Sequence, residues 1–249
     1  GVAIRAALAQ AGCASVDELL MGCVLPAGQG QAPARQAGFA AGLGEDVPAT
    51  TLNKMCGSGM KATMMAFDQI ALGHAQTMVA GGMESMSNAP YLLPKMRGGA
   101  RIGHGQVIDH MFLDGLEDAY DKGRLMGTFA EDCAEKYQFT REAQDAYAIG
   151  SLTGALEAQK SGAFAAEIAP VSLETRTGVV EICEDEQPAK ARPEKIPQLK
   201  PAFAKEGTVT AANASSISDG AAALVVTSAA IKRVVPALAK DRVVASVAT

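Results

Sequence analysis

A short segment that contains one cysteine and two glycines, Asn53 to Lys61, constrains the fold of this chain more than any other stretch. The residues before it, Pro48 to Met55, form an extended run. Residues at the helical period follow it, namely Met60, Thr63, Met64, Phe67, Ile70 and Ala71. The pattern predicts a sharp strand-to-helix turn with Cys56 in the first turn of the helix. Unpaired N–H groups there would stabilise a thiolate, and Gly57 and Gly59 would let a carbonyl group reach the sulfur.

A buried structural cysteine is the alternative interpretation of Cys56, since free cysteine is among the most buried residue types. The other cysteines lack the glycine setting and are interpreted as structural: Cys13, Cys23, Cys133 and Cys183. Five cysteines without C-x-x-C spacing indicate neither a disulfide framework nor a zinc site. We therefore expect no metal, and a reducing, cytoplasmic location.

Composition excludes several classes of protein. The chain has 249 residues, of which 48% are hydrophobic, as in a soluble globular protein of one large or two ordinary domains. Its formal net charge is −5 with scattered lysines and arginines, which is no footprint for nucleic acid. Apolar runs such as Gly220 to Val226 are far shorter than the roughly 20 residues that span a bilayer, so we expect no membrane segment.

Helical and extended patterns alternate over the first part of the chain, with helix at 3–11, strand at 19–25 and helix at 32–41. This alternation favours an α/β fold with a parallel sheet covered by helices. Between Asn88 and Glu206 the pattern changes to glycine-rich loops, a charged helical region and proline-punctuated segments. We interpret that stretch as an insertion, after which Val209 to Val226 resumes the earlier pattern.

Two further glycine- and alanine-rich regions accompany the cysteine segment: Ala80 to Ser87, and Gly207 to Ser215 with Asp219 to Ala223. Together with Cys56 they make the chain closely similar to the thiolase family, in particular its acetyl-CoA acetyltransferase branch. The similarity runs from near residue 1 to about residue 228. The segments that carry it are Ala80 to Ser87, Gly207 to Ser215, Asp219 to Ala223, Gly28 to Ala37 and Asp114 to Leu116.

The resemblance implies a layered αβαβα fold of five layers. It divides the chain into an N-terminal α/β domain at 1–87 and 207–228, a loop domain at 88–206, and the start of a C-terminal domain at 229–249. It also implies a fragment that lacks the first strand and most of the C-terminal domain. Thiolases carry an Asn in an N-E-A-F motif, a His in a G-H-P motif and a second Cys in that later half. None of these motifs is found in this sequence.

The activity implied by the resemblance is reversible condensation of two acetyl-CoA molecules to acetoacetyl-CoA and CoA, or thiolysis of a 3-ketoacyl-CoA. Cys56 would be the nucleophile that carries the acyl group. The positions that match the coenzyme A channel of thiolases are Leu116, Met126, Phe203, Ala211 and Ser215. Coenzyme A thioesters would be substrates, with no permanently bound cofactor.

The same resemblance implies a homodimer or homotetramer, with a tetramerisation loop around Tyr91 to His104. Two departures concern the substrate: Leu125-Met126-Gly127 stands where the family often has His-Met-Gly, and Lys190 and Arg192 are the nearest candidates for an adenine-stacking arginine. We expect His104 and His110 at the surface. The alternatives are a related ketoacyl synthase and a non-catalytic thiolase-like interaction protein.

Polar residues of the turns have a structural interpretation. We expect Glu84 to be a buried carboxylate that ties down a turn, and Asp219 to cap its own turn. His74 follows a predicted helix end, where a cation suits the helix dipole.

Overall fold

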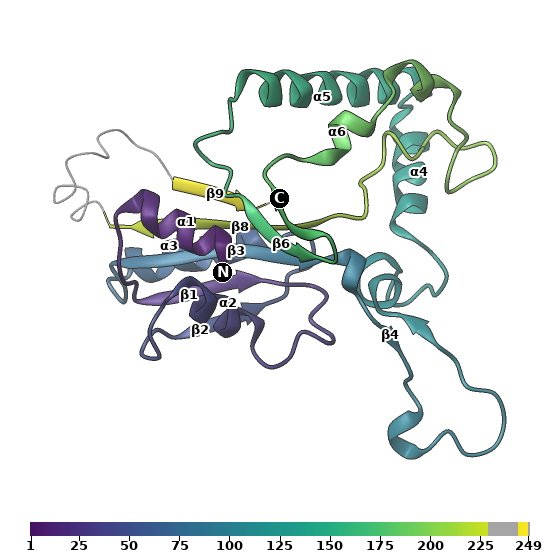
Figure 1. Cartoon of the computed structure of the whole chain (residues 1–249). Helices are drawn as coiled ribbons and strands as arrows, with labels where there is room; N and C mark the ends of the chain where they lie inside the picture. The colour runs from purple at the N-terminus through teal and green to yellow at the C-terminus, as the bar shows by residue number, and fades with distance from the viewer. Residues whose placement is uncertain (229–243, 249) are drawn as a thin grey trace. The chain divides into compact units, whose positions relative to one another are not determined.

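The computed structural model describes residues 1–228 and the backbone of residues 244–248. Its contacts divide the chain into two compact units (Figure 1). The first unit comprises residues 1–90, 166–183 and 218–249, and the second comprises residues 91–165 and 184–217.

A five-stranded sheet forms the centre of the first unit. In pairing order its strands are β2 (Ala49–Leu52), β1 (Glu18–Gly22), β3 (Thr77–Ser85), β8 (Asp219–Thr227) and β9 (Val244–Ala248). β2, β1 and β3 are parallel, whereas β8 is antiparallel to β3, and β9 is antiparallel to β8. The parallel part confirms the α/β class predicted from the alternation of helices and strands.

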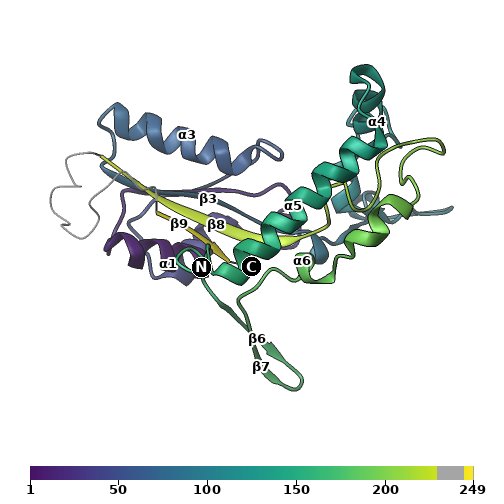
Figure 2. The same cartoon turned by 90° about the horizontal axis from the view of Figure 1, so that it is seen from above.

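Helices cover both faces of this sheet. α1 (Val2–Ala11) and α2 (Pro33–Ala41) pack with Leu19 and Met21 of β1 in one core, and α3 (Ser58–Ala71) packs with Leu20 in the other. Successive strand residues point to opposite faces, so one apolar run supplies both cores. Figure 2 shows α3 and α1 on opposite sides of the strands.

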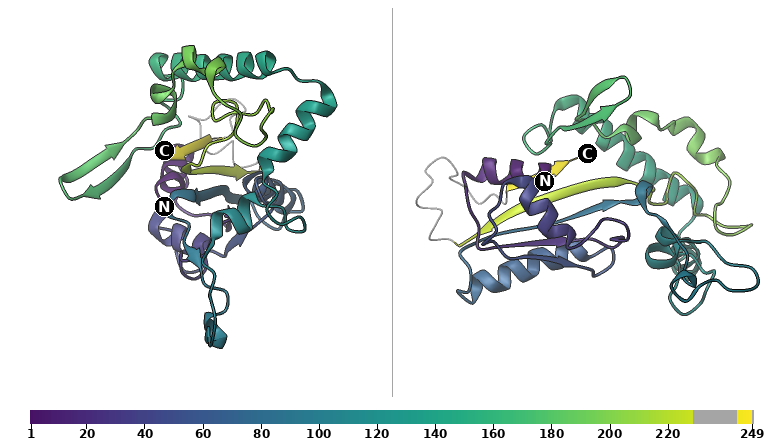
Figure 3. Two further views of the ribbon diagram at one scale, coloured as in Figure 1. Left: turned by 90° about the vertical axis from the view of Figure 1, so that its right-hand side faces the viewer. Right: turned by 60° about the horizontal axis from the view of Figure 1, so that its bottom comes forward.

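A two-stranded hairpin, β6 (Val171–Thr175) and β7 (Gly178–Ile182), also belongs to the first unit. It extends away from the sheet in Figure 3. At its base Val171 packs against the α1–α2 core, and the Gln10 side chain donates a 2.7 Å hydrogen bond to the Ala166 carbonyl. These contacts attach a distant part of the chain to the first unit.

The second unit is mainly helical, with one short antiparallel strand pair. Its elements are β4 (Tyr91–Leu92), η2 (Met96–Gly98), β5 (Ile108–Asp109), η3 (Phe112–Leu116), α4 (Met126–Tyr137), α5 (Arg141–Ser161), α6 (Glu186–Lys190) and η4 (Pro193–Gln198). The charged helical region is thus two helices. α4 ends at Tyr137 and is followed by Gln138, whose φ of 57° is left-handed. Thr140 caps α5 by accepting the Ala143 amide at 3.2 Å.

The expected domain boundaries stay a prediction. The compact units place residues 166–183 with the first sheet and residues 207–217 with the helical unit. Of the expected C-terminal part, residues 229–243 lie outside the described residues, while β9 pairs with β8 along the sheet of the first unit.

In the part of the chain that the structure describes, every helix is too short or too polar to cross a membrane.

Candidate active site

Cys56 lies in the connection between β2 and α3, and its side chain is exposed. α3 begins at Ser58 with Gly57 as its N-cap, so the prediction that Cys56 lies in the first helical turn is wrong by one or two positions. The reason is a preceding tight turn. Met55 has a left-handed φ of 51°, and the Ser58 amide donates to the Met55 carbonyl at 2.9 Å.

Side chains around the cysteine reinforce this turn. The Lys54 amide donates to the Ser58 hydroxyl at 2.8 Å, and the Met55 amide donates to the Asn53 side-chain oxygen at 2.9 Å. Among the described residues, no hydrogen-bond acceptor faces the Gly59 or Met60 amide. Cys56 therefore stands beside a helix N-terminus that still has free donors, where negative charge is stabilised.

Glycines bring the N-terminus of α3 close to the sheet. A Cβ on Gly22, at the end of β1, would lie 2.6 Å from Ser58 Cβ and 2.9 Å from the Gly59 nitrogen. A Cβ on Gly59 would lie 3.7 Å from the Gly81 carbonyl oxygen of β3. The helix start thus rests on the carboxyl end of β1 and on the middle of β3. The carboxyl ends of parallel strands are the edge at which open α/β sheets bind ligands.

Cys23 has the opposite environment. It is buried, and its thiol lies 3.6 Å from the Gln29 side-chain oxygen and 3.7 Å from a Glu84 oxygen. Burial, followed by the negative charge of Glu84, raises the pKa of the Cys23 thiol. Fewer thiolates form at neutral pH when the thiol pKa rises, which agrees with a structural role for Cys23.

Glu84 ties down a turn, although it is half-buried rather than fully buried. Its carboxylate accepts the Val24 and Leu25 amides, each at 2.9 Å. Asp219 likewise holds a turn, because it accepts the Ser87 amide at 3.0 Å, although this bond joins distant parts of the chain rather than capping its own turn.

The expectation that His110 lies at the surface is wrong. His110 is only 4% exposed, and its Nδ1 lies 2.7 Å from an Asp114 oxygen one helical turn further on. That neighbour lets the imidazole be buried with a polar partner. His104 is exposed, and exposed His74 contacts the Gln69 side chain at 2.9 Å just after α3.

The second unit contains a pocket of about 490 Å³. It is lined by α5, by α6 and η4, and by a loop that includes Ala211, Ala212, Ala214 and Ser216. Its charged lining residues are three basic ones, Lys190, Arg192 and Lys195, and one acidic one, Asp185. Lys190 is paired with Glu186 at 2.6 Å, whereas the described residues offer Arg192 and Lys195 no ion pair.

Of the five predicted coenzyme A contacts, the structure places Ala211 in this pocket and the exposed Ser215 between two lining residues. The remaining three do not line it. Leu116 and Met126 flank a bridge between Glu117 and Leu125. The ring of Phe203 lies against Gly127, where a Cβ would come within 2.3 Å of it. All three belong to the second unit.

Sequence reasoning missed the polar residues that support the pocket. Lys195 lines it, and Asp145, Asn213 and Glu131 hydrogen-bond beside or behind its walls. The only available signal was the spacing of Arg141 and Asp145, four residues apart on a helix. Among the described residues, no group of three or more His, Cys, Asp or Glu side chains could hold a metal ion.

The fold and site define a layered α/β protein that presents one exposed thiol at a strand-to-helix turn. A model of the thiolase N-terminal domain matches residues 1–230. The chain belongs to the thiolase family.

Relatives and solved structures agree with this assignment. The chain is 50% identical over 230 residues to a probable acetyl-CoA acetyltransferase of Dictyostelium discoideum, covering 91% of this chain and 55% of that protein. It is 52% identical over 233 residues to an acetyl-CoA acetyltransferase of Cupriavidus necator, covering 92% and 59%. A thiolase of Ascaris suum crystallised with coenzyme A superimposes with a TM-score of 0.85 at 40% identity, covering 93% and 60%. The chain thus spans little more than half the length of these relatives.

Proposed function

We propose that the protein transfers acyl groups between coenzyme A thioesters, with Cys56 as the nucleophile. One observation carries this proposal: the exposed Cys56 thiol stands beside the free amides that begin α3. In this position the Cys56 sulfur can attack a thioester carbonyl, and the neighbouring amides can stabilise the negative charge that forms on the carbonyl oxygen.

The first half-reaction follows from this geometry. The Cys56 thiolate attacks the acyl-CoA carbonyl, the carbon–sulfur bond to coenzyme A breaks, and the acyl group remains on Cys56 as a thioester. The coenzyme A thiolate leaves and takes up a proton. One thioester replaces another, so this step is nearly balanced in free energy.

In the second half-reaction, a base removes a proton from the methyl group of acetyl-CoA. The carbanion attacks the carbonyl of the acetyl-cysteine, the carbon–sulfur bond to Cys56 breaks, and acetoacetyl-CoA leaves while the Cys56 thiolate is regenerated. The reverse sequence cleaves a 3-ketoacyl-CoA. The names of the two relatives support acetyl transfer as the particular chemistry. They favour it over ketoacyl synthase activity and over a purely structural role.

The basic pocket of the second unit is a candidate site for part of the coenzyme A substrate. Its volume lies within the range of about 300–1,000 Å³ that small-molecule sites occupy. Arg192 and Lys195, which have no acidic partner among the described residues, suit phosphate groups. Leu116, Met126, Phe203 and Ser215 remain candidates for the pantetheine arm, with coenzyme A as a substrate and not as a resident cofactor.

Alkylation of the cysteines tests the role of Cys56. We expect iodoacetamide near neutral pH to modify Cys56 faster than Cys133 and Cys183, which are also exposed, and to modify buried Cys23 last. Acetyl-CoA added beforehand should block Cys56 alone and leave an acetyl group on its peptide. Peptide mapping by mass spectrometry measures both effects. Equal labelling of Cys56, Cys133 and Cys183, without protection by acetyl-CoA, would refute the proposal.

The assembly expected from the family is a homodimer or homotetramer in the cytoplasm. Large apolar side chains are exposed in the proposed tetramerisation loop, including Tyr91, Met96 and Ile102, the last 99% exposed. Burial of such residues between subunits would remove apolar surface from water. Light scattering of the intact protein at micromolar concentration should give at least twice the subunit mass. A folded monomer would contradict this expectation.

A further inference from the structure

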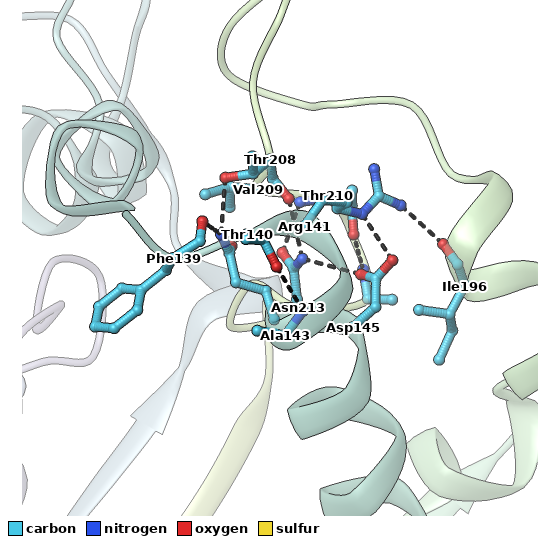
Figure 4. Close-up of polar contacts among 12 residues, drawn as sticks. Phe139, Thr140, Arg141, Ala143, Asp145, Ile196, Thr208, Val209, Thr210 and Asn213 are labelled. Carbon is cyan, nitrogen blue, oxygen red and sulfur yellow. Dashed lines mark hydrogen bonds and ion pairs between the residues drawn. The ribbon is translucent and has the colours of Figure 1, made fainter. Parts of the chain in front are cut away.

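Asp145 is a buried carboxylate on α5, and neither of its oxygens is left without a partner (Figure 4). The residue is 4% exposed. Arg141 Nε donates to one oxygen at 2.7 Å, and the Asn213 side-chain nitrogen donates to the other at 3.2 Å. A carboxylate buried this deeply is stable only while such charge-assisted bonds are kept.

Through these two partners Asp145 connects to two separate segments that line the pocket. Arg141 also donates to the Ile196 carbonyl of η4 at 2.9 Å, and Ile196 is a lining residue. Asn213 donates to the Thr208 carbonyl at 3.1 Å and accepts the Thr210 amide at 2.7 Å. Asn213 thereby closes the loop of residues 208–214, which carries three of the lining alanines.

The third wall of the pocket is the helix that carries Asp145 itself. Ala148, Ser151 and Leu152 line the pocket and follow Asp145 on α5 by one to two turns. One carboxylate thus holds η4 and the 208–214 loop against the helix that completes the site. Asp145 does not line the pocket.

We propose that Asp145 is a positioning residue for coenzyme A. Through Arg141 and Asn213 it holds η4 and the 208–214 loop against α5. This inference rests on the proposed function of the pocket. The 208–214 loop keeps a second attachment, because Glu131 on α4 accepts the Thr208 and Val209 amides, each at 2.9 Å. An Asp145→Asn protein should therefore fold, with its loop walls less firmly held.

Electrostatics alone predicts the opposite effect of this substitution. Coenzyme A is a polyanion, so removing a negative charge near its pocket would strengthen binding if charge were all that mattered. Positioning predicts weaker binding, because an asparagine amide places N–H groups against the donors of Arg141 or Asn213. The sign of the change therefore separates the two explanations.

The test compares the intact wild-type protein with Asp145→Asn, Asn213→Ala and both together. Asp132→Asn is the matched control, because it removes one acidic charge from α4 at an exposed ion pair with Arg124. We expect the KM for coenzyme A in thiolysis to rise about tenfold or more in each network variant, as for the loss of a hydrogen bond to a charged group. kcat should stay within about twofold, and the double variant should be less than additive.

Hydrogen exchange provides a readout that does not depend on coenzyme A. Amides at 193–198 and 208–214 should exchange faster in Asp145→Asn than in Asp132→Asn, with the first unit unchanged. A fall in kcat with an unchanged KM would show a general loss of folded protein and would overturn the inference. Unchanged exchange would also overturn it. If the wild-type protein itself fails to bind coenzyme A, the proposed function of the pocket falls, while the exchange result still decides the role of Asp145 in holding the walls.

Discussion

Replacement of Cys56 by alanine is expected to lower acyl transfer by at least about 10⁴-fold, as for the loss of other catalytic nucleophiles. Without the sulfur, no covalent bond can retain the acyl group after coenzyme A leaves. The residue is exposed and its backbone conformation suits alanine equally well, so the fold should persist. Thiolysis of acetoacetyl-CoA, followed by absorbance on the intact protein, measures the loss.

The matched controls are Cys133→Ala and Cys183→Ala, which remove exposed thiols from the other parts of the chain. Both proteins should keep wild-type turnover and wild-type acetylation by acetyl-CoA. Cys56→Ala should show neither, while its circular dichroism and melting temperature match the wild type. If Cys56→Ala retained more than a few per cent of the activity, another group would have to be the nucleophile.

Residues 1–249 produced alone are expected to take up acetyl from acetyl-CoA on Cys56 but to give no measurable turnover of acetoacetyl-CoA. Formation of the carbon–carbon bond requires a base that creates the carbanion. A general acid or base contributes about 10²–10⁴-fold and an oxyanion donor about 10²–10³-fold, so loss of several such groups removes nearly all turnover. Within the first unit, His74 follows the far end of α3, about 20 Å along the helix from Cys56.

The comparison for this second prediction is a protein extended to the length of the relatives, assayed beside residues 1–249 at equal concentration of acylated Cys56. The extended protein should complete the cycle. Equal turnover in the two samples would show that the base lies within residues 1–249. His104 and His110 would then be examined first, together with His74, by substitution with glutamine.

Part of the surface of α3 is apolar and exposed. Met60 is 72% exposed, Phe67 is 64% exposed, and Met64 lies between them on the same face. Three large apolar side chains at helical spacing on an open face are typical of a helix that packs against another layer. The layered fold of the family agrees with this feature.

Local signals predicted much of the first unit correctly. The apolar periods marked α1, α2 and α3, and the glycine-flanked cysteine marked the turn at which β2 leads to α3. These features depend on neighbours a few residues apart, so they can be inferred from the sequence alone. The resemblance of three ordered motifs to thiolases then identified the family, which the domain match confirms.

Tertiary contacts decided what the local patterns could not. The start of α3 was misplaced because a left-handed Met55 and the Ser58 hydroxyl close an additional turn first. His110 is buried just before the short irregular helix η3, and its ring pairs with Asp114 of that helix. In the first case a polar contact changes the backbone conformation, and in the second it accompanies burial of a polar side chain. Composition alone predicts neither.

The sequence by itself determined the family, the α/β class and the cysteine on which the proposed chemistry depends. Each of these depends on short motifs or periodic patterns whose residues are close together in the chain. Only the tertiary structure decided how the pocket of the second unit is built. Asp145 is separated from Ile196 and Asn213 by more than fifty residues, yet the fold brings all three segments to one carboxylate. A buried charge needs partners from wherever the chain returns, and no local pattern specifies which residues those are.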